Sequence, residues 1–191
     1  MQPRTSTTHP LQLPFVDTPG GGRIGMTFCP GKHDPMAVTG PWARDLDTDL
    51  QAIVDWGARA LVTLMEQHEL EHLGVADLGK RAQTAGLGWF HLPIQDVSVP
   101  AAAFEQQWET AGAEFRRKLS QGRSIVVHCR GGLERSGLIA ARLLVDMGDE
   151  PVIALRRVRK ARPGAVETTE QEDYARHLEQ ASAPGVLVSR L

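Results

Sequence analysis

The sequence predicts an α/β fold in which a central, mostly parallel sheet is flanked by helices. Two observations support this prediction. Short apolar segments rich in β-branched residues alternate along the chain with longer segments whose apolar residues recur at helical spacing. The chain has 191 residues, 41 % of them hydrophobic, which suits one domain with a substantial core. Such alternation is typical of parallel sheets, because each parallel strand needs a crossover that a helix can supply.

Four segments are expected to form strands, because they are short, apolar and rich in residues that favour extended chain. They are RIGMTFC from Arg23, RALVTLM at 59–65, GWFHLPI at 88–94 and SIVVHC at 124–129. Residues 1–22 precede the first strand. They are rich in Thr, Pro and Gly, so we expect an irregular segment there.

Six segments are expected to form helices. They lie around residues 46–54, 75–86, 104–119, 137–148 and 168–181, with one more that Pro151 opens. Asp45 or Asp47 is positioned to cap the first helix, and Gly86 to end the second. The segment 137–148 is apolar on nearly every face, which indicates a buried helix.

Charge and cysteine content exclude several classes of protein. The net charge of -2 does not favour nucleic acid or an anionic membrane as a partner. No apolar run approaches the roughly 20 residues that span a bilayer. The N-terminal residues lack the apolar core of a secretion signal, and there are only two cysteines. We therefore expect a protein of the reducing cytoplasm.

The stretch HCRGGLERSG joins a predicted buried strand to a predicted buried helix. Its two glycines allow a tight turn that exposes backbone N–H groups, and the helix N-terminus adds a positive field. Arg135 supplies a planar fork for two phosphate oxygens. The same field favours the thiolate of Cys129, to which Ser136 can donate a hydrogen bond. The alternative without a catalytic role is a buried cysteine in a glycine turn. The coincidence of all these features instead predicts an anion site with a sulfur nucleophile.

This stretch resembles the HCxxGxxRS signature of the cysteine-dependent protein tyrosine and dual-specificity phosphatases. GRIGMTFCPG before it, PIQD in the middle and ARPGAVETTEQ after it are most similar to the cyclin-dependent-kinase-associated phosphatase group. The resemblance covers about residues 22–182. It implies a mainly parallel sheet flanked by helices and the shallower pocket of the dual-specificity class. We expect an irregular segment at 1–22, a phosphatase domain at 23–182 and a tail at 183–191.

The resemblance implies a phosphomonoester hydrolase that works through a cysteinyl-phosphate, with no metal or other cofactor. Cys129 would attack phosphorus, Arg135 would hold phosphate oxygens, and Ser136 would stabilise the departing thiolate. Five further loop residues are expected to bind substrate: Arg130, Gly131, Gly132, Leu133 and Glu134. Glu134 stands where most members carry glycine, and its carboxylate opposes an incoming dianion. We expect Arg130 to offset that charge.

A general acid must protonate the leaving group, and Asp96 is the candidate. It follows a predicted strand in PIQDVSVP, a segment that resembles the general-acid loop of the family. The alternative role for a loop aspartate is turn formation, and Asp77 and Asp34 are weaker candidates. GAVETTEQ resembles the segment in which two glutamines position water and phosphate. Here these positions hold Glu167 and Gln171, and the alternative for Glu167 is a helix N-terminal acid.

Three other features suggest further roles. HELEH, at 68–72, fits a zinc-protease pattern, but its context favours a polar, partly exposed helical turn. A basic cluster could form a solvated helix face or a rim that attracts phosphorylated substrate: Arg156, Arg157, Arg159, Lys160 and Arg162. Cys29 is more readily a core residue than a resolving cysteine for Cys129.

The sequence thus predicts a cytoplasmic protein tyrosine or dual-specificity phosphatase that acts on a phosphorylated protein or a small phosphorylated molecule. One alternative is a phosphatase of a lipid, nucleotide or sugar phosphate. The other is an inactive phosphate-binding module, which Glu134 and Glu167 favour weakly.

Overall fold

A computed structural model describes residues 2–179. Its centre is a five-stranded sheet of order β1-β2-β7-β5-β6. The strands are β1 (Phe15–Asp17), β2 (Arg23–Phe28), β5 (Ala58–Thr63), β6 (Gly88–His91) and β7 (Ser124–Cys129). The last four in this order run parallel, and only β1, at one edge, runs antiparallel to its neighbour. The prediction of a mostly parallel central sheet is confirmed.

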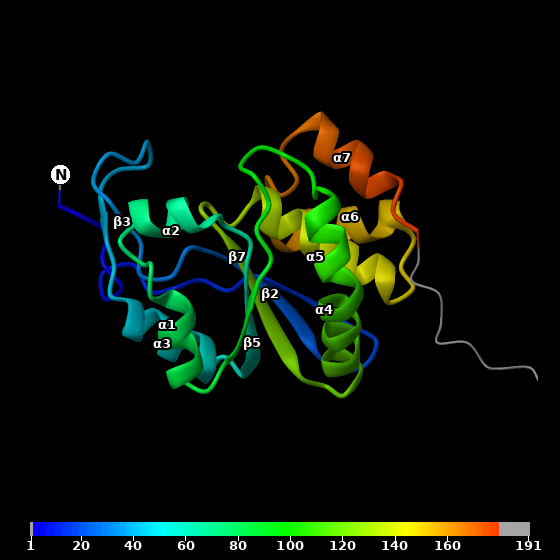
Figure 1. Ribbon diagram of the computed structural model, residues 1–191, viewed down its shortest axis with the longest axis horizontal. Helices are drawn as coiled ribbons and strands as arrows, with labels where there is room; N and C mark the ends of the chain where they lie inside the picture. The colour runs from blue at the N-terminus through cyan, green and yellow to red at the C-terminus, as the bar shows by residue number, and fades with distance from the viewer. Residues whose placement is uncertain (1, 180–191) are drawn as a thin grey trace, which may run out of the picture.

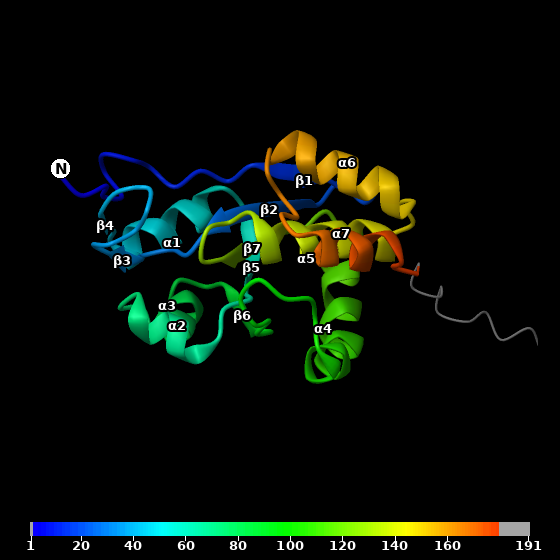
Figure 2. The same cartoon turned by 90° about the horizontal axis from the view of Figure 1, so that it is seen from above.

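Helices cover both faces of the sheet, as Figures 1 and 2 show. One layer holds α1 (Leu46–Asp55), α2 (Gln67–His72) and α3 (Leu78–Thr84). The other holds α4 (Ala102–Ser120), α5 (Glu134–Asp146), α6 (Pro151–Ala161) and α7 (Thr169–Arg176). Within the described part of the chain, no helix is both long and apolar enough to span a membrane.

Two hydrophobic cores lie against the two faces of the sheet. The larger core joins the central strands to α4 and α5, and the smaller one joins them to α1 and α3. Every residue of β7 is buried, as in a central parallel strand covered on both faces. Ten of the 13 residues of α5 are buried too. The strand and the helix on either side of the HCRGGLERSG loop are therefore firmly packed.

The structure departs from the sequence predictions at short or terminal elements. Residues 1–22, expected to be irregular, contain β1, a three-residue strand that is too short to show a pattern. The last helix ends at Arg176 rather than 181, and residues 180–191, with the predicted tail, lie outside the described residues. The strands predicted to end at 65 and 94 end at Thr63 and His91.

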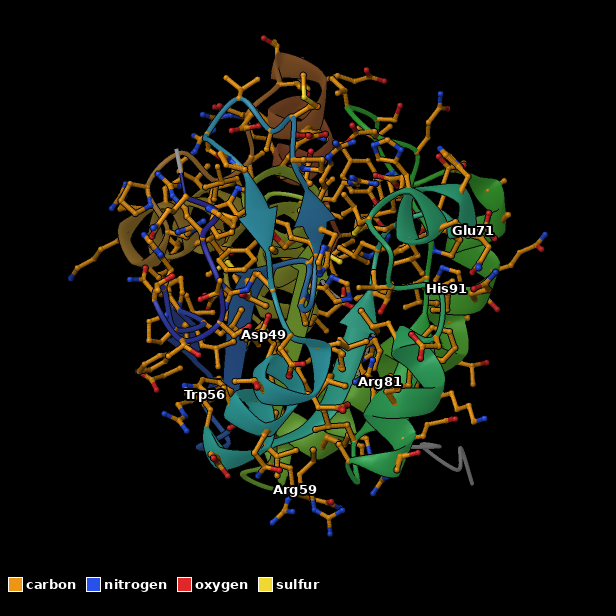
Figure 3. The ribbon with its side chains drawn as sticks, turned by 90° about the vertical axis from the view of Figure 1, so that its left-hand side faces the viewer. Asp49, Trp56, Arg59, Glu71, Arg81 and His91 are labelled. Carbon is orange, nitrogen blue, oxygen red and sulfur yellow. The ribbon has the colours of Figure 1, made fainter. Side chains whose placement is uncertain are left out.

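A small hairpin also escaped prediction. It consists of β3 (His33–Asp34) and β4 (Trp42–Ala43). Asp49 of α1 fastens its two ends: its carboxylate accepts a 2.8 Å hydrogen bond from the N–H of Gly31 and two 2.7 Å bonds from Arg44. Figure 3 shows Asp49 on α1, below the hairpin. This buried anchor fixes the hairpin at the carboxyl end of the sheet, where Figure 1 also places α7.

His128, in β7, is a fully buried titratable group behind the loop. Its Nε2 lies 2.8 Å from the hydroxyl of Thr63 on the neighbouring strand. Burial lowers the pKa of His128 from its ordinary 6.5 to about 3. The folded protein therefore keeps this ring neutral at a pH at which the unfolded chain protonates it.

We expect His128 to make the free energy of unfolding fall as the pH drops from about 6.5 towards 3. Below pH 6.5 the unfolded state binds a proton that the folded state does not, so each pH unit costs up to about 1.4 kcal/mol. Urea unfolding at several pH values measures this slope. His128→Gln should reduce it, whereas the exposed control His33→Gln should keep it. A slope unchanged in His128→Gln would contradict the assignment.

Candidate functional site

Cys129 lies at the carboxyl end of β7, and the loop that follows it wraps around its sulfur. The N–H of Gly132 donates a 3.3 Å hydrogen bond to Sγ, and the hydroxyl oxygen of Ser136 lies 3.5 Å from Sγ. The two contacts come from the loop and from the first turn of α5. Together they hold the sulfur at the start of the helix, where backbone N–H groups favour negative charge.

The two glycines of the loop differ in how much space surrounds them. Gly132 has φ of +71°, and a Cβ there would lie 2.4 Å from the backbone N of Phe28 on β2. Only glycine fits so close to the neighbouring strand in this conformation. At Gly131, by contrast, a Cβ would meet nothing within 4 Å. The fixed glycine of the HCxxGxxRS pattern falls on Gly132, the position where the structure requires it.

A pocket of about 420 Å³ opens over this loop. Eight of the predicted site residues line it: Asp96, Cys129, Arg130, Gly131, Leu133, Glu134, Arg135 and Glu167. It is also lined by Lys32, Asp34 and residues 36–39 of the β3–β4 hairpin. Three predicted site residues, Gly132, Ser136 and Gln171, do not line it, and all three are buried. The structure thus brings most of the predicted residues together around Cys129.

Arg135 is buried, and its hydrogen bonds leave one edge of the guanidinium uncommitted. Nη1 donates to Glu69 Oε2 at 2.7 Å and to the carbonyl of Ile94 at 3.0 Å, and Nη2 donates to Glu69 Oε1 at 2.9 Å. A guanidinium has five N–H groups, so Nε and one N–H of Nη2 remain. Nε is buried and has no hydrogen-bond partner among the described residues. Asp96 Oδ1 lies 2.8 Å from Nη2, beside this edge.

Glu69 is a site residue that the sequence analysis missed. It is the first of the two glutamates in HELEH, and its carboxylate accepts two hydrogen bonds from Arg135 and a third, of 2.9 Å, from the N–H of Glu66. Burial alone would raise the pKa of Glu69, but the hydrogen bonds from Arg135 and Glu66 hold it below its usual range. His68 and His72 are exposed. The spacing of Glu69 from the apolar Leu73, one helical turn later, could have indicated that it faces inward.

Glu134 and Gln171 pair with each other beside the pocket. The amide Nε2 of Gln171 donates to Glu134 Oε1 at 2.7 Å and to the carbonyl of Ser98 at 3.1 Å. Burial raises the pKa of Glu134, and the charges of Asp96 and Glu167 raise it further, although Gln171 opposes the shift. Both N–H groups of the Gln171 amide are therefore used inside the protein.

The expectation that Arg130 offsets the charge of Glu134 is wrong. Arg130 pairs with Asp34, at 3.0 Å, and not with Glu134. The side chain of Asp34 is almost fully buried and is engaged with Arg130, which leaves it poorly placed as a general acid. Asp77, the other weaker candidate, occupies the N-cap position of α3 and lines a separate hollow on the α1–α3 face.

Two valines that are sequence neighbours of pocket residues have strained backbones. Val97 and Val166 have φ of 59° and 60°, and they are the only non-glycine residues with positive φ in the described part of the chain. A β-branched residue in this region costs about 1–3 kcal/mol. Val97 directly follows Asp96, and Val166 directly precedes Glu167. The backbone strain is therefore located beside two carboxylates of the pocket.

The basic cluster is mostly engaged in holding the fold. Arg157 contacts Asp149 and the carbonyl of Asp17, and Arg159 pairs with Glu172 at 2.7 Å. Arg162 donates a 3.0 Å hydrogen bond to the carbonyl of Gly132. This last contact joins the residue that follows α6 to the loop after Cys129 and supports that loop on its outer side.

Cys29 lies in the smaller core. It follows Phe28, the register partner of Cys129, but packs on the other face of the sheet. Burial raises the pKa of the Cys29 thiol. The prediction that Cys29 is a core residue is confirmed.

We expect Glu69→Gln to weaken oxyanion binding by about tenfold or more. The amide cannot accept both hydrogen bonds from Arg135, so the guanidinium loses its fixed orientation while it stays buried. Calorimetric titration with vanadate measures the affinity. Glu71→Gln is the matched control, because Glu71 lies exposed on the same helix (Figure 3). Equal affinities in the two variants would show that Glu69 does not position Arg135.

Comparisons with known proteins point to one family. Residues 37–149 match the family model Tc-R-P, described as "Polymorphic toxin system, DSP-PTPase phosphatase". Cyclin-dependent kinase inhibitor 3 of Rattus norvegicus is 31 % identical over 136 residues, which cover 69 % of this chain and 62 % of the rat protein. The Homo sapiens protein of that name is 29 % identical over 162 residues, covering 77 % of this chain and 73 % of its own length. The chain thus spans less than two thirds of the rat relative.

Solved structures agree with this fold. A kinase associated phosphatase with its catalytic-site cysteine replaced by serine superposes with a TM-score of 0.76 at 24 % identity, covering 87 % of this chain and 93 % of that one. Tk-PTP in its active form gives 0.65 at 27 % identity, covering 87 % and 95 %. Because the family model spans more than half of the chain, the protein belongs to the dual-specificity class of the cysteine-dependent phosphatases, close to the kinase-associated group.

Proposed function

We propose that this protein hydrolyses phosphomonoesters of phosphorylated proteins through a cysteinyl-phosphate intermediate. The observation that carries the proposal is the meeting of Cys129, Arg135 and Asp96 at one pocket. These residues offer a nucleophile, a cationic fork and a carboxylic acid. Transfer of a phosphoryl group to sulfur requires these three kinds of group.

In the first step the thiolate of Cys129 attacks phosphorus, so that an S–P bond forms as the ester P–O bond breaks. The uncommitted edge of Arg135, Nε with one N–H of Nη2, holds two of the phosphate oxygens, and backbone N–H groups of the loop hold the rest. Asp96 gives its proton to the departing oxygen. Because Asp96 lies 2.8 Å from Nη2 of Arg135, the phosphate displaces it from this edge on binding.

In the second step a water attacks the cysteinyl-phosphate, and Asp96, now a carboxylate, takes its proton. The thiolate leaves, and the hydroxyl of Ser136, 3.5 Å from Sγ, donates a hydrogen bond to it. Gln171 is committed to Glu134 and Ser98, so positioning the water falls to Asp96 and Glu167 at the pocket. Every step uses only groups of the chain, the substrate and water.

The mouth of the pocket supports a protein substrate. Met36 and Val38 of the hairpin line the pocket, Val97 lies beside Asp96, and all three are exposed apolar side chains. Exposed apolar groups around a reactive centre are suited to contact a polypeptide. A lipid phosphate is the second candidate, since PTPMT1 in complex with PI(5)P shares the fold, with a TM-score of 0.63 at 17 % identity. The carboxylates of Asp96, Glu134 and Glu167 disfavour headgroups with several phosphates on that side.

Cys129→Ser should abolish turnover of an aryl phosphate and keep vanadate binding. A hydroxyl is a far weaker nucleophile near neutral pH, but the loop and Arg135 remain to hold the anion. The release of aryl alcohol and calorimetry with vanadate measure the two effects. A chelator should leave the wild type active. A substantial rate in the serine variant would exclude the covalent mechanism, and absence of turnover in the wild type would favour an inactive binding module.

Asp96→Asn should lower the rate by roughly 10²–10⁴-fold for substrates with poor leaving groups. The loss should shrink as the leaving group becomes more acidic, because such a group departs without a proton. Steady-state rates across a series of aryl phosphates measure this dependence. If the loss is the same across the series, Asp96 acts on position and not on proton transfer.

A further inference from the structure

Lys32 is a largely buried cation at the pocket, and no anionic group among the described residues forms a hydrogen bond or ion pair with it. The residue is only 7 % exposed, yet it lines the pocket together with Cys129 and Arg130. Among the residues that the structure describes, no carboxylate or carbonyl oxygen accepts a hydrogen bond from its ammonium group. Its Nζ instead lies 4.3 Å from the ring centre of Trp42 and 5.1 Å from that of Phe28. Aromatic faces stabilise a cation less than an oxyanion does.

Asp34, whose charge acts on Lys32, and Asp49, which anchors the hairpin, are both committed to other cations. Asp34 accepts a hydrogen bond from Arg130 at 3.0 Å, and Asp49 accepts two from Arg44 at 2.7 Å. Burial lowers the pKa of Lys32, and the positive charges of Arg130 and Arg44 lower it further, against the charge of Asp34. An ammonium group that is held at a pocket without a carboxylate partner is positioned to bind an anionic ligand there.

The chain holds Lys32 in a fixed place. The carbonyl of Lys32 accepts a 3.2 Å hydrogen bond from the N–H of Arg44, and the preceding Gly31 is bonded to Asp49. Residues 36–39 of the hairpin form the pocket wall on the same side. The ammonium group is therefore preorganised rather than carried on a free surface side chain, and an anion that binds there has little ordering entropy to overcome.

The charges of the pocket are divided between its two sides. On the side of the hairpin, Arg130 and Asp34 pair with each other, so Lys32 leaves that side with an excess positive charge. The other carboxylates of the pocket lie on other elements: Asp96 in the loop before α4, Glu134 at the start of α5 and Glu167 in the turn before α7. Figure 1 shows the hairpin and α7 on opposite sides of the same end of the molecule. A second anionic group on a substrate is thus attracted towards the hairpin and repelled from the opposite side.

We propose that Lys32 binds a second anionic group of the substrate, separate from the phosphate that Cys129 attacks. The inference rests on the proposed function and specifies its substrate class. In a phosphoprotein the group is an acidic side chain or a second phosphorylated residue next to the reacting one. Both present the same oxyanion chemistry to an ammonium group.

The test compares phosphotyrosine peptides that differ at one neighbouring residue, which is Gln, Glu or phosphoserine. In one set of peptides this residue lies directly before the phosphotyrosine, and in the other set it lies directly after it. For at least one set, the wild type should cleave an acidic peptide with a kcat/KM about tenfold above that of the Gln peptide. The comparison of Glu with phosphoserine identifies the preferred source of the anion.

Lys32→Met removes the charge and keeps a side chain that packs on the rings, so the acidic-to-neutral ratio should fall to about one. Lys32→Arg and the exposed control Lys80→Met should keep a preference for the acidic peptide. If the acidic-to-neutral ratio of kcat/KM is the same in the wild type and in Lys32→Met, the proposal is overturned. This includes the case in which Lys32→Met lowers the rate for every peptide by the same factor. Loss of the preference in Lys32→Arg as well would assign the effect to packing and also overturn it.

A binding measurement separates this inference from the proposed function. The same peptides are titrated by calorimetry onto Cys129→Ser and onto Cys129→Ser combined with Lys32→Met. If the wild type cleaves no peptide, the proposed function fails, but the ratio of the dissociation constants still tests Lys32. A tenfold preference for an acidic peptide that disappears in the double variant supports the proposal, and equal ratios reject it.

Discussion

The buried ion pair between Arg135 and Glu69 is the contact on which the site depends. It joins α5 to α2, which belong to opposite layers, across the carboxyl end of the sheet. An unpaired guanidinium at this depth would cost several kcal/mol, and Glu69 offsets that cost. The pair also fixes which edge of the guanidinium remains for a ligand. The orientation of one side chain in the pocket is thus set by the packing of both layers.

The sequence predicted the parts of the site that local patterns determine. Apolar runs identified β7 and α5, and the motif between them placed Cys129 and Arg135 correctly at the pocket. Asp96 was proposed as general acid because it follows a predicted strand, and it lines the pocket. Glu69 was missed because its partner is 66 residues away and its own motif suggests a metal ligand. Pairings of this kind depend on how distant loops meet, which no local pattern contains.

Two pairings distinguish the rim of this pocket, although the centre keeps the residues of the phosphatase signature. Glu134 replaces a glycine and binds Gln171, and Arg130 turns instead to Asp34 near the hairpin. Charge at the rim is therefore unevenly distributed although the sulfur, the guanidinium and the loop backbone follow the family pattern. Short elements such as β3 and β4 escaped prediction because two-residue strands carry no periodicity, yet they shape one wall of the pocket.

The two adjacent glycines of the loop have unequal tolerance for evolutionary change. Any side chain at Gly132 would press against the backbone of β2 and push the loop away from Cys129, so this position is closed to variation. Gly131 lines the pocket and has open space where a Cβ would be. A new side chain can enter there without disturbing the sulfur. Gly131 is therefore the position at which a descendant of this protein could acquire a different range of substrates at little cost to its stability.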